Sequence, residues 1–360
     1  MNTPTPALVI DLPIVKRNID RLAEYGRKHS IAIRPHTKTH KSLRMAKLQL
    51  DAGASGLTVA KVGEAITMSA VCDDLFVAYP ALDPWRREHL AKLARTHKVQ
   101  VGFDSPEAAD SIGAAASDAD VTIGVLVDLD VGLHRTGVQT PADALALAQH
   151  VSKTPGLRLD GIMCYPGQVK HAIQEQPAIV APVAELLQET LDLWKTNGFE
   201  AKVVSGGSTP SAYQSHLMPQ VNEIRPGTYI FNDMSVVSCG YATLADCAAR
   251  LRCTVISTAV PGKFVIDAGS KSLTQDRRTI DPDTAGFGHV VEYPLAKITR
   301  LSEEHGEVDA TKCGKRPRIG EIVHIIPNHI CPVVNLQTMV WLRDGEKTEP
   351  MAVDARGQVW

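Results

Sequence analysis

Between residues 31 and 230 the chain alternates short, continuous apolar runs with longer stretches in which apolar residues recur every three or four positions. The short runs have the length of buried strands, and the longer stretches have the spacing of helices that pack one face against a sheet. Helical spacing is clearest over residues 41–53 and 181–200. The predicted strands are IAIRP (31–35), GLTVA (56–60), DLFVAYP (74–80), VQVGFD (99–104), VTIGVLVDL (121–129), LDGIMCY (159–165), AKVVSGG (201–207) and EIRPGTYI (223–230).

Eight strand–helix units in this region favour a (β/α)8 TIM-type barrel, whose strands are covered on both faces and therefore read as continuous apolar runs. A doubly wound sheet is the competing arrangement, but it would use fewer strands over this length. After residue 240 the chain is β-rich and joined by turns, with little helical spacing. We therefore expect an α/β fold in two parts: a barrel over residues 13–238, and a second, mainly β domain made of residues 1–12 and 239–360.

Composition and charge are those of an ordinary soluble protein, since 44% of the residues are hydrophobic, 22% are charged and the formal net charge is −2. This balance indicates neither a nucleic-acid partner nor attraction to a membrane, and no apolar run reaches the length of a membrane span. The seven cysteines are scattered without a CxxC pair, and the N-terminus lacks the pattern of a signal peptide. We therefore expect a cytoplasmic protein.

Barrel enzymes carry their functional groups where each strand ends and the following loop begins. Directly after the first predicted strand lies RPHTKTHK (34–41), with five groups that are or can become cationic. Neighbouring positive charges favour the neutral amine that a lysine needs as a nucleophile or Schiff-base former, so Lys38 is a candidate for that role. The groups that would supply this charge are Arg34, His36, His40 and Lys41. A basic turn at the end of a strand would explain the same residues.

The segment VSGGSTPS (204–211) places two glycines and several hydroxyl groups between a predicted strand and the next helix. Glycines allow the backbone to approach a ligand closely, and N–H groups at a helix start favour a phosphate. The segment lacks the GK[ST] ending of a Walker loop, and an ordinary strand-to-helix turn would have a similar composition. A reactive lysine together with a phosphate site suggests pyridoxal phosphate as the cofactor.

His329 and Cys331, in PNHICPVVN (327–335), lie two residues apart in a predicted strand and would therefore point to the same face. Both could bind one divalent cation, with water, another side chain or substrate completing the coordination, as at a catalytic metal. A buried histidine and cysteine without a metal is the alternative.

The segment YPGQVKH (165–171) follows the sixth predicted strand and contains Tyr165 and His171. A histidine of near-neutral pKa is suited to act as a general base. A histidine in a surface loop would look the same, so this segment alone does not decide between the two interpretations.

Taken together, these segments resemble the D-threonine aldolase / eukaryotic-type D-serine dehydratase family. Its members are metal-activated pyridoxal phosphate enzymes of fold type III, with an alanine racemase-like barrel and a β domain. The matching segments follow the family's order over almost the whole chain: TPALVIDL (5–12), RPHTKTHK (34–41), AKVGEA (60–65), DVGLHRTGV (130–138), YPGQVKH (165–171), VSGGSTP (204–210), EIRPGTYIFND (223–233), VIDAGSKSL (265–273), LSEEHG (301–306) and PNHICPVVN (327–335).

The resemblance implies a role for each matching residue. Lys38 would carry pyridoxal 5'-phosphate, and Arg135 would lie near the phenolic oxygen of the cofactor. His329 and Cys331 correspond to the family's metal pair, and the family's sites form between two subunits, so a homodimer is implied. The residues that would hold the cofactor are Lys38, Arg135, Tyr165, Ser205, Gly206, Gly207, Ser208, Thr209 and Tyr229.

The family's two reactions both start from a β-hydroxy D-amino acid. The Y-x-G-x-x-x-H pattern matches the aldolases, in which the histidine takes the hydroxyl proton, so His171 would be the base of a retro-aldol cleavage of the D-threonine type. The His-x-Cys pair instead resembles D-serine or D-threo-3-hydroxyaspartate dehydratases, which give a 2-oxo acid and ammonia. Lys170 and Gln168 also depart from the aldolase pattern. We favour the aldolase because that mechanism depends on an available base.

The metal could be zinc, manganese or magnesium, and the cysteine ligand favours zinc. An amino-acid racemase shares the barrel and the lysine, but it would have no use for the His-x-Cys pair. A non-enzymatic pyridoxal phosphate-binding protein of the homeostasis type is a single barrel, which the β-rich second part opposes.

Overall fold

The computed structural model describes residues 3–277 and 286–360. The chain divides into two compact units, which we call the barrel unit (residues 19–227 and 357–360) and the β unit (residues 1–18 and 228–356). All seven cysteines lie in the described part, most of them are buried, and none forms a disulfide. None of the described helices combines the length and the apolar character needed to cross a membrane.

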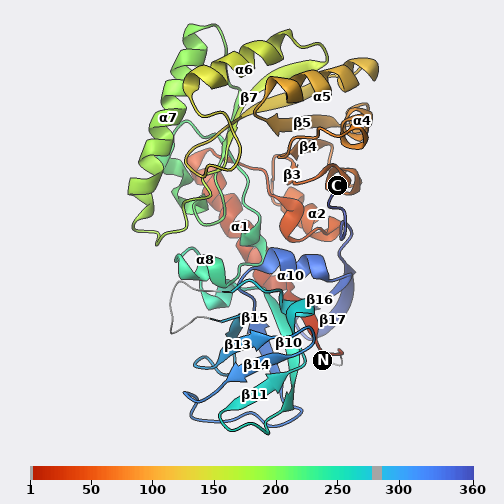
Figure 1. The fold of residues 1–360 in the computed structure, drawn as a ribbon, viewed down its shortest axis with the longest axis vertical. Coiled ribbons are helices and arrows are strands. Elements are labelled where there is room, and N and C mark those ends of the chain that lie inside the picture. The colour runs from red at the N-terminus through yellow and green to blue at the C-terminus, as the bar shows by residue number, and fades with distance from the viewer. Residues whose placement is uncertain (1–2, 278–285) are drawn as a thin grey trace. The chain divides into compact units, whose positions relative to one another are not determined.

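The barrel unit is built on one eight-stranded parallel sheet with the order β2-β9-β8-β7-β6-β5-β4-β3 (Figure 1). An isolated parallel bridge between His36 and Thr58 joins the two ends of this order. Each strand overlaps a predicted one, so the predicted fold class of this part is confirmed. The strands are β2 (Ala32–Ile33), β3 (Leu57–Val59), β4 (Asp74–Val77), β5 (Lys98–Phe103), β6 (Ile123–Leu129), β7 (Leu157–Cys164), β8 (Val203–Gly206) and β9 (Glu223–Ile224).

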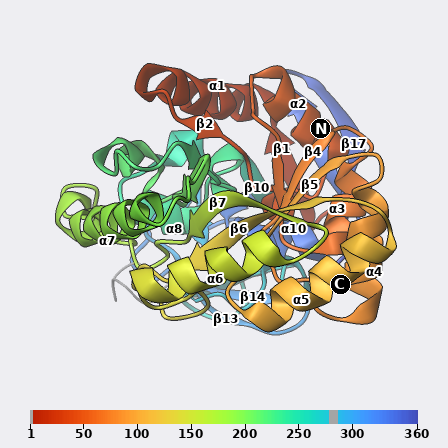
Figure 2. The same cartoon turned by 90° about the horizontal axis from the view of Figure 1, so that it is seen from above.

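Helices follow most of these strands, and α5 and α6 lie side by side over β6 and β7 (Figure 2). Three of the helices begin with a proline directly after a residue whose side chain caps the first turn: Asp83, Ser105 and Thr140. The helices are α1 (Leu12–His29), within which the division between the units falls, and α2 (Leu43–Asp51), α3 (Val62–Met68), α4 (Pro84–Leu93), α5 (Pro106–Asp118), α6 (Pro141–Lys153) and α7 (Gln176–Thr196).

The strand–helix alternation changes at two points of the barrel unit. After β8 the chain forms the 3-10 helix η2 (Ala212–Leu217) instead of an α-helix, in a segment bounded by Pro210 and Pro219. After β2 it forms η1 (Thr37–Thr39) before α2 begins. The first of these helices in the chain, η1, contains the predicted Lys38, and η2 begins directly after the predicted phosphate segment, residues 204–211.

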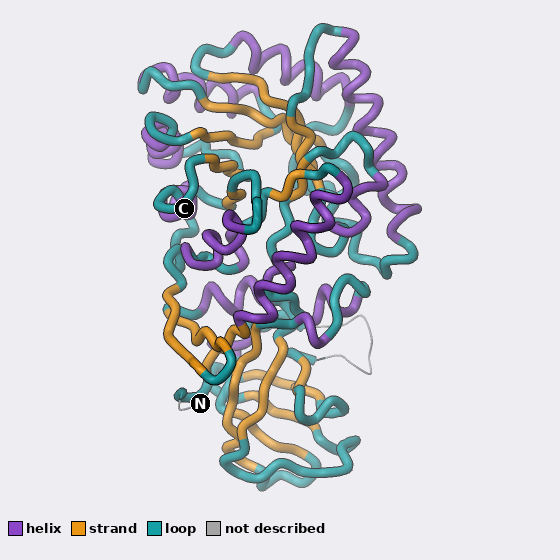
Figure 3. The backbone as a smooth tube through the Cα atoms, turned by 180° about the vertical axis from the view of Figure 1, so that it is seen from behind, coloured by secondary structure: helices purple, strands orange, loops and turns teal. Residues whose placement is uncertain are grey.

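The β unit contains a nine-stranded, largely antiparallel sheet, visible as the lower group of strands in Figure 3. Along β10 buried and half-exposed residues alternate, so one face of the sheet forms the apolar core and the other is polar. The predicted second, mainly β domain is thereby confirmed. The strands are β1 (Ala7–Asp11), β10 (Ala249–Ser257), β11 (Lys263–Ile266), β12 (His289–Val290), β13 (Lys297–Leu301), β14 (Gly306–Asp309), β15 (Ile322–Ile326), β16 (Met339–Asp344) and β17 (Lys347–Ala352).

Short helices complete the β unit. They are η3 (Thr228–Ile230), α8 (Met234–Ser238), η4 (Leu244–Asp246), α9 (Ser270–Leu273) and α10 (Ile330–Leu336).

Candidate active site

Lys38 lies in η1, just beyond the end of β2, where a barrel places its functional groups. It is exposed, whereas every other residue from 33 to 42 is buried. An exposed lysine on a fully packed turn is fixed at its base and accessible at its amine, which is the arrangement a cofactor-bearing lysine requires.

The cationic neighbours of Lys38 do not form the positive field that the sequence suggests. Arg34 is buried, with Nε 2.7 Å from Glu223 Oε2 and Nη1 2.7 Å from Asp74 Oδ1. Lys41 is buried as well, and its Nζ lies 3.2 Å from Glu64 Oε1. Both charges are therefore balanced by carboxylates, because a charge buried without a partner would be too costly.

The two histidines of the same turn are held neutral. Burial lowers the pKa of His40 to about 4, and its Nε2 lies 3.1 Å from Gln49 Oε1. Burial also lowers the pKa of His36 well below its usual value, and the nearby charges of Lys38 and Arg225 lower it further. Neither ring carries a positive charge at neutral pH.

Arg225, which sequence reasoning missed, is a buried cation close to this turn. Its Nη1 donates to Ser205 Oγ at 2.5 Å and its Nη2 donates to Cys164 O at 2.9 Å. Ser205 Oγ in turn donates to Glu223 Oε1 at 2.6 Å, so a buried polar chain runs from Arg34 through Glu223 and Ser205 to Arg225. The only signal in the sequence was two charged residues within the otherwise apolar strand segment EIRPG.

The glycine turn after β8 has the form of a phosphate-binding turn. Gly207 has φ +77°, and a Cβ there would lie 2.8 Å from Ile224 Cγ2, so only glycine fits. Beyond it, the Thr209 hydroxyl is buried and has no hydrogen-bond partner among the described residues. A buried hydroxyl without a partner is costly unless a ligand supplies an acceptor, so this turn suits a phosphate.

The other residues of the predicted phosphate site differ in whether they can still contact a phosphate. Ser208 is buried, and its backbone N–H donates to Ser211 Oγ at 3.2 Å. The Ser205 hydroxyl is already bonded to Glu223 and Arg225, so it supports β8 and has no proton to donate to a phosphate. Gly206 ends β8, and a Cβ there would lie 3.2 Å from Cys164 Sγ, so any side chain would crowd the neighbouring strand β7.

Two predicted cofactor residues meet at the ends of β6 and β7. The Arg135 guanidinium carbon lies 4.9 Å from the centre of the Tyr165 ring, within the range of a cation–π contact. Nearby, Asp128 is buried at the end of β6 and accepts a hydrogen bond from Thr136 Oγ1 at 2.8 Å. Burial raises the pKa of Asp128 to about 6, although that hydrogen bond lowers it.

His171 is exposed in the loop after β7. The loop backbone is held by Gln176, a buried residue whose Nε2 donates to His171 O and to Pro210 O, each at 3.0 Å. One amide group thus ties the predicted base to the end of the glycine turn. Sequence reasoning did not identify Gln176, because a glutamine in the first turn of a helix has no distinctive pattern.

His329 and Cys331 lie in the β unit but not on a strand, so the predicted strand geometry is wrong. Strand β15 ends at Ile326, because Pro327 cannot continue it, and His329 is the N-cap of α10. The two side chains still come together: a hydrogen bond that the protonated His329 ring donates to the Cys331 sulfur is the main reason that the pKa of His329 rises to about 9. The pair forms across a helix start, where the strand rule does not apply.

A buried carboxylate holds this segment in place. Asp233 accepts a hydrogen bond from Ile330 N at 2.9 Å, and it caps α8 through Ser235 N at 3.1 Å. Beside it, Met234 N donates to Pro327 O at 3.0 Å. The Thr228 hydroxyl lies 3.7 Å from Cys331 Sγ. The start of α10 is therefore fastened to residues 228–235, the region that also contains the buried Tyr229.

The donor set fits a divalent metal with an open coordination shell. An imidazole nitrogen and a sulfur are ligands that zinc accepts readily. His329 Nδ1 also lies 3.7 Å from Asp276 Oδ2. Within residues 3–277 and 286–360 no group of three or more His, Cys, Asp or Glu side chains is placed to hold a metal ion. Water or substrate would complete the shell.

Comparison with known proteins agrees with this arrangement. Residues 10–235 match the family described as alanine racemase, N-terminal domain, and residues 248–342 match a domain described for serine dehydratases. The D-threonine aldolase of Arthrobacter sp. is 30% identical over 98% of this chain and 93% of its own length.

Solved structures give the same result. A D-threonine aldolase from Filomicrobium marinum superposes with a TM-score of 0.91 at 29% identity, over 99% of this chain and 97% of its own. A mutant of D-threo-3-hydroxyaspartate dehydratase in its metal-free form superposes with a TM-score of 0.90 at 27% identity, over 100% and 99% of the two chains. With its barrel, its mainly β second part and relatives that are lyases of both kinds, the chain belongs to the D-threonine aldolase / D-serine dehydratase family, whose members use pyridoxal phosphate.

Proposed function

We propose that this chain is a pyridoxal phosphate- and divalent-metal-dependent lyase that cleaves β-hydroxy D-amino acids by a retro-aldol reaction, with D-threonine giving glycine and acetaldehyde. The similarity to a D-threonine aldolase over 98% of the chain supports the reaction class. The loop after β7 is the single observation that favours the aldolase, because it presents an exposed His171 on a backbone that Gln176 fixes to the glycine turn.

Different residues of the barrel unit would hold different groups of the cofactor. Lys38 would bond it through its amine, the Thr209 hydroxyl and the glycine turn would hold its phosphate, and Arg135 and Tyr165 would contact its ring. When bound, the cofactor supplies an electron sink for the pair released as the Cα–Cβ bond breaks. His171 would accept the proton of the β-hydroxyl group at a ring nitrogen, which turns the hydroxyl into the carbonyl of the aldehyde product.

His329 and Cys331 would hold the metal, and zinc suits a nitrogen and a sulfur ligand better than manganese or magnesium does. A bound metal supplies Lewis acidity, which polarises the β-hydroxyl group and makes its proton easier to remove. Asp233 contributes by position, because its hydrogen bond to Ile330 N fixes the backbone between the two ligands.

One assay tests the proposed reaction. Purified protein with pyridoxal phosphate and zinc or manganese is given D-threonine, and acetaldehyde is measured with alcohol dehydrogenase. In a parallel assay the protein is given D-serine, and pyruvate is measured with lactate dehydrogenase. We expect acetaldehyde and little pyruvate, and both should disappear on chelation. Pyruvate without aldehyde would overturn the aldolase and establish the dehydratase.

The dehydratase is the second candidate because of Cys331. The His-x-Cys pair resembles that of the family's dehydratases, so a cysteine ligand favours the dehydratase reaction. In that reaction Lys38 would remove the Cα proton, and the metal would help the hydroxyl group to leave. His171 would then have no role, so the His171→Ala variant separates the two: it should lose aldol cleavage but keep dehydration.

The family resemblance also implies a homodimer, in which each active site forms between two subunits. Light scattering behind a sizing column should give about twice the 38.9 kDa of one chain. A monomer with full activity would contradict this part of the proposal without affecting the reaction. A cytoplasmic location stays an expectation from the scattered cysteines.

A further inference from the structure

One face of the sheet in the β unit is unusually basic. The register places Arg250 opposite Val9, Arg252 opposite His324, and Asp11 beside Arg343, so all of these side chains lie on the same face. The other face carries the apolar core, as the alternation along β10 shows. Three arginines on one face repel one another unless negative charges lie among them.

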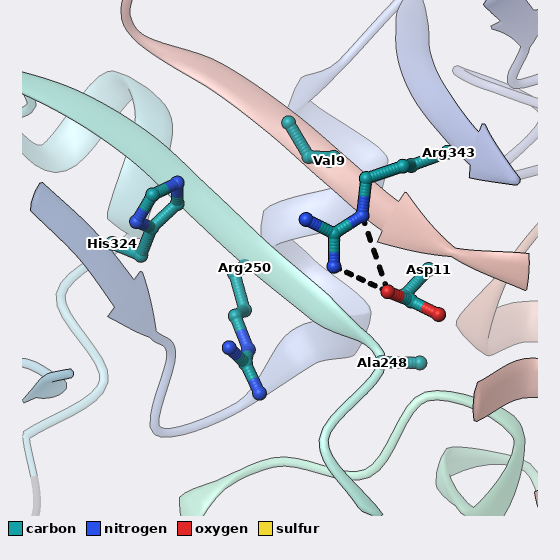
Figure 4. Close-up of a pocket in the computed structure, with 6 residues that line it drawn as sticks. All are labelled: Val9, Asp11, Ala248, Arg250, His324 and Arg343. Carbon is teal, nitrogen blue, oxygen red and sulfur yellow. Dashed lines mark hydrogen bonds and ion pairs between the residues drawn. The ribbon is translucent and has the colours of Figure 1, made fainter. Parts of the chain in front are cut away.

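A small cavity opens on this face. It has a volume of about 70 Å³, several times the roughly 10–15 Å³ that one water needs. The Arg250 and Arg343 side chains extend toward it from either side, with the His324 ring at its edge (Figure 4). The residues that line it are Val9, Asp11, Ala248, Arg250, His324 and Arg343.

The charges that line the cavity are only partly balanced. Arg343 donates to Asp11 Oδ2 through Nε at 3.2 Å and also through Nη2. His324 Nδ1 lies 2.7 Å from Glu292 Oε1. Arg250 is half-buried, yet its guanidinium has no hydrogen bond or ion pair with any residue that the structure describes.

We propose that this cavity binds a small carboxylate, with Arg250 as its main ligand. A half-buried arginine presents a fork of N–H donors that fits the two oxygens of a carboxylate. Asp11 pairs with Arg343 and Glu292 pairs with His324, so Arg250 is left among the described lining residues as the cation without a carboxylate, and a singly charged anion suits it better than a phosphate dianion. Val9 and Ala248 add apolar surface, which suits a short aliphatic tail, and the volume excludes anything as large as a nucleotide.

The test uses acetate as the probe on the cofactor-loaded protein. The line width of the carboxyl signal of [1-13C]acetate is followed by NMR as protein is added, for the wild type and for Arg250→Gln. We expect about a tenfold weaker affinity in the variant, because the bidentate, charge-assisted contact is lost. Equal broadening by both proteins would overturn the site. Any acetate bound at the active site is common to both, so it does not affect the difference.

The matched control is Arg252→Gln. Arg252 lies two residues along the same strand and on the same face, but its Nη1 donates to Thr3 O at 2.8 Å and it does not line the cavity. It should keep most of the affinity, and an equal loss in both variants would show a general effect of charge and contradict the site. Arg250→Lys keeps the positive charge but lacks the paired N–H donors of the guanidinium. It should also bind acetate more weakly than the wild type, and it replaces Arg250→Gln in the test if that variant does not fold.

A second titration with inorganic phosphate distinguishes the two kinds of oxyanion. Acetate should be displaced only at much higher phosphate concentrations, and displacement at equal concentrations would contradict the assignment to a carboxylate. Turnover is not measured in either titration, so failure of the proposed lyase reaction and failure of this site would be seen separately.

Discussion

The barrel unit and the β unit hold their charged groups in different ways. In the barrel unit the charges lie inside: Arg34, Glu223 and Arg225 are all buried and linked through one serine hydroxyl. In the β unit Arg250, Arg252 and Arg343 instead lie half-exposed on one face of a sheet. The buried network is costly to disturb because each charge depends on its partner, whereas the exposed face can lose a charge with little effect on the fold.

The difference matches the two kinds of chemistry in the proposed function. A covalently bound cofactor would require a rigid rim, and the packed turn around Lys38 would supply it. A metal ion that binds substrate would need a coordination position open to water, and the exposed N-cap residue His329 would leave one. The predictions below test each side of this comparison.

The largest effect should come from Lys38→Ala. The variant should lose the visible absorbance of the bound cofactor and reduce turnover by about four orders of magnitude or more, because the covalent attachment is removed. Borohydride reduction followed by peptide mapping should label Lys38 in the wild type. The control is Lys170→Ala, at an exposed position in the loop before His171, which should keep its absorbance. A label on another lysine would refute the assignment.

The next effect concerns a buried carboxylate of the barrel unit. Burial raises the pKa of Asp128 from 3.8 to about 6, so the folded protein favours the neutral acid, and ionisation destabilises the fold as the pH rises through this window. Relative to the wild type, Asp128→Asn should therefore gain about 2 kcal/mol of unfolding free energy between pH 4 and pH 8. Urea unfolding at both pH values measures this, and a difference independent of pH would contradict it.

A similar or smaller effect is expected in the β unit from Asp233→Asn. The variant weakens the hydrogen bond that holds Ile330 N between the two metal ligands, so its zinc affinity should fall by about 10- to 100-fold. Competition with a chromophoric chelator measures the affinity without turnover.

The control for this variant is Asp309→Asn. Asp309 also accepts a hydrogen bond from a backbone N–H, that of Thr311, but it does not contact the segment with His329 and Cys331. Its zinc affinity should not change. A folded Asp233→Asn protein that binds zinc as tightly as the wild type would remove Asp233 from the site.

The smallest effect should come from Gln176→Ala. Removing the amide frees the loop backbone at His171 from the glycine turn, so cleavage of D-threonine should slow by several-fold while the spectrum of the cofactor is unchanged. Gln188→Ala is the control, because Gln188 lies on the same helix and its side chain bonds Asp192 and Gln220. Equal rates for the two variants would mean that the tether has no part in the reaction.

The sequence predicted the barrel well because its strands are covered on both faces and so stand out as apolar runs. It also placed Lys38, Arg135 and Tyr165 at strand ends, and the structure brings the last two into contact. Apolar periodicity reports burial but not partners, so the pairing of Arg34 with Glu223, and the balance of charge around Lys38, could not be read from it.

At the start of α10 the prediction from the sequence is wrong. The sequence predicts a strand at His329 and Cys331 because the residues before them are apolar and β-branched, but Pro327 ends that strand. A three-residue segment contains too little periodic signal to distinguish a strand from a helix start. The pairing of the two side chains could be predicted from their types, whereas its geometry depends on Asp233, almost one hundred residues earlier in the chain.

The place of β1 has a consequence for how the protein is made. This strand, residues 7–11, lies between β10 and β16, so its neighbours are residues near 250 and 342. A ribosome releases it long before either neighbour exists, and the sheet cannot be completed until nearly the whole polypeptide has emerged. A nascent chain stopped before residue 339 should therefore expose the apolar edge of this strand to chaperones, even though residues 19–227 of the barrel unit are already translated.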